Sequence, residues 1–182
     1  LCPAQVCRRI EHFASAQAVD IHGLGPATIE RLVATGRLHT VADLYRLRIE
    51  DFGTGSGPAG RTGGDVLRSI ARSKTAELWR VVHGLGIARI GRAHSRRVAA
   101  AFPSLEQLVR VRPEDFQAGA PGAAAKLGAA AEDSLLDYMT DPTRRGVVRL
   151  GHGGLGVAAR SSTARAAPHG PPGWTAAGSP RS

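Results

Sequence analysis

Apolar residues recur at spacings of three and four in several separate segments of the chain, which is the period of an amphipathic helix. Ile29, Leu32 and Val33 fall on one face of the first such segment, and residues 76–85 repeat the pattern. Aromatic residues make up only 4% of the chain, so the core must be aliphatic and rich in alanine. Such a core favours packed helices over a sheet. We therefore predict an all-α fold.

A turn built around two glycines precedes the first of these helices. Gly23 and Gly25 flank Leu24, and a turn of this kind can take positive φ and bring backbone N–H groups close to an anion. Pro26 suits the first position of the helix, because its missing N–H would be unpaired there in any case. The N–H groups and the positive helix end suit a phosphate oxygen and carry no base information. The pattern is typical of a helix-hairpin-helix element, although a plain helical turn with a glycine cap has the same residues.

Weaker copies of this turn recur about every 35 residues, a spacing typical of helical repeats. In the second copy Ala59 takes the place of a glycine and adopts positive φ less readily, so this hairpin is expected to fray. Its glycine-rich loop lacks a Lys-Ser or Lys-Thr at P-loop spacing, which argues against nucleotide binding. The third and fourth copies have Arg89 and Lys126 at the first glycine position. The three copies are Gly57-Pro58-Ala59, Arg89-Ile90-Gly91 and Lys126-Leu127-Gly128.

The ends of the predicted helices carry cap signals. Gly36 is predicted to cap the first helix, and a short helix is predicted to begin at Val41. A further helix over 92–102 follows the third turn. Asp141 and Pro142 are predicted to end the helix that follows the fourth turn, since the residue before a proline disfavours helical backbone.

The net charge is +9 and the isoelectric point about 11.1, which points to a polyanionic partner. A GC-rich coding sequence gives the same Arg-, Ala-, Gly- and Pro-rich composition, so charge alone does not assign a function. Arg92, Arg96 and Arg97 follow the third turn, where they could lie along a phosphate backbone or form an ordinary solvated helix face. No apolar run could span a bilayer and no signal peptide opens the chain, so we expect a cytoplasmic protein without membrane contact.

Cysteine and histidine residues suggest no complete metal or catalytic site. Cys2, Cys7 and His12 are possible zinc ligands, but five-residue steps on a helix place them at roughly 0°, 140° and 280° around the axis. They would point apart, and the two cysteines are therefore expected to be free thiols. The seven histidines are scattered, and no nucleophile motif accompanies them. No catalytic residue is predicted.

Several motifs in series resemble bacterial NAD-dependent DNA ligase. They are CPAQ, IEHFAS, AVDIHGLG, ADLYRL and VVHGLGIARIG, and they fall in the order of that family. The resemblance covers residues 2–150, from the last cysteine of the family's four-cysteine zinc module through its helix-hairpin-helix domain. It implies that Cys2 is the fourth zinc ligand, and that Cys7 is none. It also implies that the other zinc ligands, the adenylated lysine and the nucleotidyltransferase core lie upstream of this chain, which begins with Leu rather than Met.

The resemblance divides the chain into four parts. Residues 1–19 would be the stub of the zinc module and a linker helix, 20–75 and 76–142 two pairs of helix-hairpin-helix units forming two lobes, and 143–182 a disordered tail. The tail has no acidic residue after the last predicted helix region and resembles no family domain, so it could be a shifted reading frame or a basic DNA-binding extension. The residues predicted to contact DNA are Gly23, Leu24, Gly25, Arg61, Arg89, Gly91, Arg92, Arg96, Lys126 and Gly128.

The predicted function is sequence-independent binding of duplex DNA, with a nick as the expected feature, within a ligase that seals nicks in replication and repair. The chain alone is expected to be inactive and to bind no cofactor, whereas NAD and zinc belong to the whole enzyme. Its expected partners are duplex DNA and the remaining ligase domains. Two alternatives remain: a truncated remnant without function, and a free-standing helix-hairpin-helix module.

Overall fold

The computed structural model describes residues 2–53, 62–102, 104–116, 127–142, 144 and 148. Within these residues the chain forms helices and no strand, which confirms the predicted all-α class. The α-helices are α1 (Pro3–Ala14), α2 (Pro26–Ala34), α3 (Gly63–Ser73), α4 (Leu78–Gly84), α5 (Arg92–Ala101), α6 (Leu105–Val109) and α7 (Ala129–Thr140). Short 3-10 helices are η1 (Val41–Arg46), η2 (Ile49–Phe52) and η4 (Pro113–Phe116). None of the described helices is long and apolar enough to cross a membrane.

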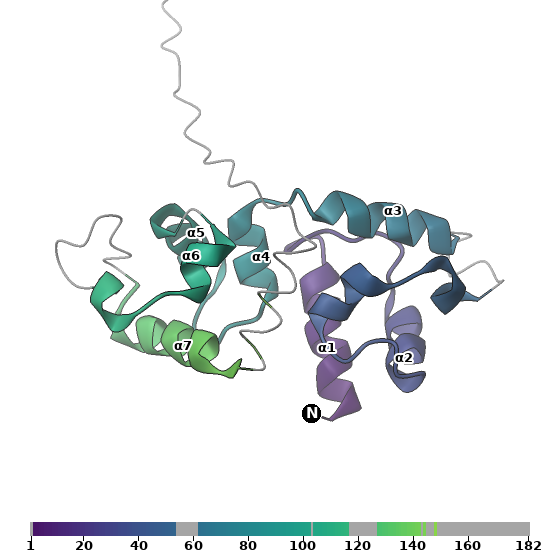
Figure 1. Cartoon of the computed structure of the whole chain (residues 1–182), viewed down its shortest axis with the longest axis horizontal. Coiled ribbons are helices and arrows are strands. Elements are labelled where there is room, and N and C mark those ends of the chain that lie inside the picture. The colour runs from purple at the N-terminus through teal and green to yellow at the C-terminus, as the bar shows by residue number, and fades with distance from the viewer. Residues whose placement is uncertain are drawn as a thin grey trace, which may run out of the picture.

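The helices pack in pairs that are joined by a contact between α1 and α4. Helix α1 packs against α2, α4 packs against α5, and α1 also packs against α4. In Figure 1, α1, α2 and α3 lie on one side of α4, whereas α5, α6 and α7 lie on its other side. The contact between α1 and α4 therefore joins the helix pair that carries the first turn to the pair that carries the third. The division into four units and two lobes stays a prediction.

Helix α2 has the ends that the sequence predicted. Pro26 occupies its first turn after the N-cap Gly25. At the other end Gly36 has φ of 70°, and its N–H donates to the carbonyl of Val33 at 3.0 Å. The N–H of Arg37 donates to Leu32 O at 2.8 Å, which completes a Schellman cap. The predicted capping role of Gly36 is thus confirmed.

Helix α3 begins at a capping box that the sequence analysis did not identify. The N–H of Thr62 donates to the Asp65 carboxylate at 2.9 Å, and the Asp65 N–H donates to Thr62 Oγ at 3.4 Å. The bond from the Thr62 backbone is the main reason why the pKa of Asp65 is lowered. The second predicted turn, Gly57-Pro58-Ala59, and Arg61 lie outside the described residues.

The core is aliphatic, as predicted, with one phenylalanine at the contact between α1 and α4. Phe13 is 1% exposed, and its ring meets that of Tyr45 edge-on at a centroid distance of 6.5 Å. A Cβ atom added at Gly84 would lie 2.9 Å from Phe13 Cδ2, so the two helices touch where α4 carries no side chain. This close approach fixes the position of α4 relative to α1.

The later helices keep the predicted order with small changes in length. Helix α4 covers residues 78–84 rather than the predicted 76–85, because Glu77 has extended backbone and Gly86 turns the chain with φ of 63°. Ser104 caps α6 by accepting the N–H of Gln107. Helix α7 ends at Thr140 with Asp141 as its cap, as predicted. The predicted disordered tail lies outside the described residues, apart from positions 144 and 148.

Candidate nucleic-acid interface

The first turn has the backbone geometry expected for a phosphate-binding hairpin. Gly23 has φ of 85°, whereas Gly25 has φ of −81° and so needs no left-handed conformation. The carbonyl of Gly25 accepts the N–H groups of Thr28 and Ile29, each at 3.0 Å. No acceptor within the described residues pairs with the N–H groups of Leu24 and Gly25. These two N–H groups are therefore available to an anion at the start of α2.

Leu24 takes part in this turn through its backbone. Its side chain is only 7% exposed and belongs to the core, so the contact predicted for Leu24 could involve the N–H group only. The turn is also held from behind, since the N–H of His22 donates to the buried Ser69 Oγ on α3 at 2.8 Å. No pattern in the sequence indicates this support from α3.

The third turn repeats the φ angles and burial of the first, but its middle N–H, that of Ile90, donates to the carbonyl of Ile87 at 3.1 Å, whereas that of Leu24 does not. Arg89 has φ of 61°, matching Gly23, and Gly91 has φ of −78°, matching Gly25. Ile90 is 4% exposed and buried like Leu24. The Gly91 carbonyl accepts from the N–H of Ser95 at 2.9 Å and from its hydroxyl at 3.1 Å. Among the described residues, no acceptor pairs with the Gly91 N–H.

A residue with positive φ also lies three positions before Gly23 and three positions before Arg89. Asp20 has φ of 58° and Gly86 has φ of 63°. The two turns therefore share two left-handed residues at the same spacing, although two of the four are not glycine. At Arg89 the cost of this conformation is offset by a hydrogen bond of 3.0 Å, in which His94 Nδ1 donates to the Arg89 carbonyl.

The two turns differ in charge. The first lines a hollow of about 480 Å³ together with the carboxylates of Glu11 and Asp20, and His22 lies 3.3 Å from Asp20. The third is followed by exposed arginines at positions 92 and 96, beside the exposed Arg89. Because DNA affinity depends on neutralised phosphates, the third turn is electrostatically the better phosphate site.

The predicted residues of the fourth turn are only partly described. Lys126 lies outside the described residues. Gly128 has φ of 85° as the N-cap of α7, and Leu127 is 5% exposed. This N-cap differs from those of the first and third turns, where the equivalent glycine has negative φ. Gly128 therefore does not share the backbone conformation of Gly25 and Gly91.

Trp79, a residue next to the third turn, was not among the residues predicted to contact DNA. Trp79 on α4 has three guanidinium groups within 5.3 Å of its ring centroid, those of Arg80, Arg92 and Arg96. Two of these arginines were predicted to contact DNA. The only signal in the sequence was an aromatic residue within an arginine-rich stretch, in a chain with 4% aromatic residues.

The residues near the start of α1 do not fit a zinc ion by themselves. Cys2 is exposed and Cys7 half-buried, both as free cysteines. Burial, Glu30 and Glu11 raise the pKa of the Cys7 thiol, which favours its protonated form. In the part of the chain that the structure describes, no three His, Cys, Asp or Glu side chains could hold a metal ion together.

His12 instead connects α1 to α4. Its Nε2 donates to the carbonyl of His83 at 3.0 Å, and the two rings meet edge-on at 5.1 Å. His83 Nδ1 is buried, with no hydrogen-bond partner among the described residues. Burial, and then the charges of His12 and Arg92, lower the pKa of His83, so the folded chain favours its neutral form.

This pair predicts acid sensitivity of the fold. The unfolded chain binds a proton at His83 near the ordinary pKa of 6.5, whereas the folded chain binds it only at lower pH. The free energy of unfolding should therefore fall as pH drops below about 6.5 and level off below the folded pKa. Urea titrations from pH 7.5 to 5 would measure this, with His83→Gln as the comparison. An equal pH dependence of the free energy of unfolding in both proteins would contradict the prediction. The lowered pKa of Asp65 keeps its own titration below the pH range of this experiment.

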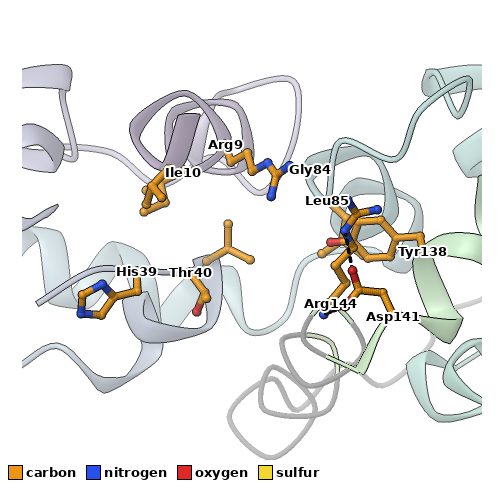
Figure 2. Close-up of a pocket in the computed structure, with 11 residues that line it drawn as sticks. Arg9, Ile10, His39, Thr40, Gly84, Leu85, Tyr138, Asp141 and Arg144 are labelled. Carbon is orange, nitrogen blue, oxygen red and sulfur yellow. Dashed lines mark hydrogen bonds and ion pairs between the residues drawn. The ribbon is translucent and has the colours of Figure 1, made fainter. Parts of the chain in front are cut away.

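A separate pocket of about 250 Å³ lies where α1, α4 and α7 meet, and Figure 2 shows its lining. Arg9 and Ile10 reach it from α1, and Tyr138 faces it beside Arg144. Arg144 is 3.2 Å from the Asp141 carboxylate and stacks on Tyr138. Burial raises the pKa of Tyr138, which therefore stays a neutral phenol.

Known proteins similar to the chain were found by sequence, while no family model matches it. The DNA ligase 1 of Opitutus terrae is 40% identical over 147 residues, which are 81% of this chain and 22% of that protein. The DNA ligase of Chlorobium chlorochromatii is 36% identical over 162 residues, 88% of this chain and 24% of that protein. The DNA ligase 2 of Deinococcus deserti is 34% identical over 147 residues, 81% and 21% respectively.

The chain thus spans less than a quarter of the length of these curated relatives. Homologues named DNA ligase nevertheless cover most of the chain, and they support its assignment to a DNA ligase.

Proposed function

We propose that this chain is the DNA-binding segment of an NAD-dependent DNA ligase, and that it holds a nicked duplex through backbone phosphates. The observation that carries the proposal is the repeated geometry of the first and third turns. Each has a left-handed residue, a buried apolar residue and an extended glycine whose N–H is available. Each also begins a helix, whose positive end favours an anion.

The chemistry of these turns explains why binding would ignore sequence. Backbone N–H groups and arginines bind phosphate oxygens, which are identical at every base pair. The first turn begins α2, which packs on α1, and the third turn begins α5, which packs on α4. Because α1 and α4 also pack on each other, the core holds the two turns at a set separation. A fixed separation suits two phosphates on one duplex, and a nick between them would not remove either phosphate.

The adenylation and sealing steps are assigned in this proposal to other parts of the enzyme. The two described hydroxyl–carboxylate pairs, Thr40 with Asp43 and Thr62 with Asp65, belong to capping boxes at helix starts. The cysteines at α1 do not make a zinc site alone. NAD and zinc are proposed for the whole enzyme, where Cys2 would be one of four zinc ligands. We propose no catalytic role for this segment beyond holding the DNA.

The test is binding to a nicked duplex across a salt series, with circular dichroism of the same sample. We expect a helical chain whose affinity falls linearly on a log–log plot between about 50 and 200 mM salt. Two turns and their arginines would neutralise roughly four phosphates, which gives a slope of about −3.6 at about 0.9 per phosphate. A second duplex of scrambled sequence should bind equally well.

Two outcomes would overturn the proposal. A helical chain that fails to bind at about 50 mM salt would show that the turns are only structural. A weakly helical chain without affinity would favour a remnant instead. An intact duplex of the same sequence measures any preference for the nick, since phosphate contacts alone predict similar affinities for both.

A further inference from the structure

Trp79 holds together a group of like charges that would otherwise repel. The Cζ atoms of Arg80, Arg92 and Arg96 lie 5.0, 5.3 and 4.7 Å from the centroid of its ring. All three distances are within the range of cation–π attraction. The ring itself is fixed, because Trp79 Nε1 donates to the Glu77 carboxylate at 2.9 Å.

Only one of the three arginines has its hydrogen bonds satisfied by the protein. Arg80 donates to the carbonyls of Ala16 and Ala18 at 3.1 and 2.8 Å, and it lies 3.8 Å from Glu77. Arg92 and Arg96 are exposed, and no carboxylate within the described residues forms an ion pair with them. Their charges are thus oriented by the ring without being neutralised.

The position of this pair follows from the sequence of α5. Arg92 is the first residue of the helix and follows Gly91 directly, and Arg96 lies one turn further along the same face. The pair therefore extends from the available Gly91 N–H along α5. On the other side Arg80, which also contacts the ring, bonds to the carbonyls of Ala16 and Ala18 in the loop between α1 and the first turn.

Resting on the function proposed above, we propose that Trp79, Arg92 and Arg96 form an additional phosphate site of the third turn, in which Trp79 is the positioning residue. Arginine loses considerable rotamer entropy when it is ordered on a ligand. Contact with the ring orders both guanidinium groups before DNA arrives, which lowers the entropic cost of binding. The ligand is a DNA backbone phosphate, and the ring makes no base contact.

Replacing Trp79 by Leu should weaken binding of the nicked duplex about threefold to tenfold, because both arginines lose their cation–π partner. Trp79→Phe keeps a ring at the same place and should restore most of the affinity. The salt slope should fall by up to about 0.9 for each phosphate lost in Trp79→Leu. Circular dichroism and urea unfolding would be recorded for each variant.

A double-mutant cycle separates positioning from simple loss of packing. In a chain that already carries Arg92→Gln and Arg96→Gln, Trp79→Leu should change affinity less than twofold, since no guanidinium pair remains to be positioned. An equal loss in both backgrounds would overturn the inference, as would unchanged affinity of a folded Trp79→Leu chain. In either case binding by the unsubstituted chain still tests the proposed function separately.

Fluorescence gives a second measurement that does not depend on affinity. The chain has two tryptophans, and Trp174→Phe leaves Trp79 as the sole reporter. Phosphate bound by Arg92 and Arg96 while they stay against the ring changes the electrostatic environment of the indole, so the emission of Trp79 should change as nicked duplex is added. The change should be lost in the Arg92→Gln, Arg96→Gln background. An unchanged emission during saturable binding would contradict the inference.

Discussion

A chain carrying Gly25→Glu together with Gly91→Glu should lose affinity for nicked duplex by on the order of 100-fold at about 100 mM salt, with its helices intact. Each glutamate places a negative charge at a turn where a phosphate is proposed to approach. Both glycines have negative φ, and a Cβ atom added at either would meet nothing within 4 Å. The backbone can therefore accept both side chains without strain.

The matched control is the double alanine variant, Gly25→Ala with Gly91→Ala. It adds the Cβ atoms without charge, so it should bind within a few-fold of the unsubstituted chain. Because alanine is a poorer N-cap than glycine, it should unfold at a somewhat lower urea concentration. Anisotropy titrations with labelled duplex would measure affinity, and circular dichroism would verify folding. Unchanged affinity in a folded double glutamate variant would show that DNA does not approach these turns.

The single variants should be unequal. Because Glu11 and Asp20 already line the hollow at the first turn, that turn contributes less attraction than the third, which has Arg92 and Arg96 behind it. Gly91→Glu is therefore expected to account for most of the loss in the double variant. This asymmetry was not predicted from the sequence, since the first turn has the more complete glycine pattern.

Local signals were sufficient to predict the all-α class and the conformation of the first and third turns. Pro26 at the start of α2 and the Schellman glycine at position 36 act within a few residues, and the structure has both where the sequence indicates them. Arg89 was aligned with the first glycine of the turn, and it takes the positive φ which that alignment requires. Patterns of this kind depend on backbone conformation, which neighbouring residues largely determine.

Contacts between distant segments were not predictable from the same patterns. The ring of Trp79 meets arginines from α5, and His12 bonds to His83 across 71 positions of sequence. Nothing local in the sequence indicates either contact, because each depends on how α4 packs against its neighbours. The left-handed Asp20 was missed for a related reason: its match, Gly86, becomes apparent only when the two turns are compared in space.

Phe13→Ala should destabilise the chain by about 3–5 kcal/mol, because it removes a fully buried ring and leaves a cavity between α1 and α4. Phe13 is 1% exposed, and it packs against the bare backbone of Gly84 and the ring of Tyr45. Small domains have only about 5–15 kcal/mol of stability, so the variant should unfold at a much lower urea concentration. Phe52→Ala is the control, since Phe52 on η2 is only partly buried and should cost clearly less.

The same variant tests whether the packing of α1 on α4 belongs to the DNA-binding state. If the two turns bind one duplex together, DNA binds the chain only when this contact is formed, and it should stabilise Phe13→Ala by mass action. At about 100 times the dissociation constant, the gain should be about 2.7 kcal/mol. Thermal unfolding with and without nicked duplex would measure it. A variant that binds DNA but gains no stability from it would show that the chain binds DNA equally well when this contact is broken, and the contact between α1 and α4 would then have a structural role only.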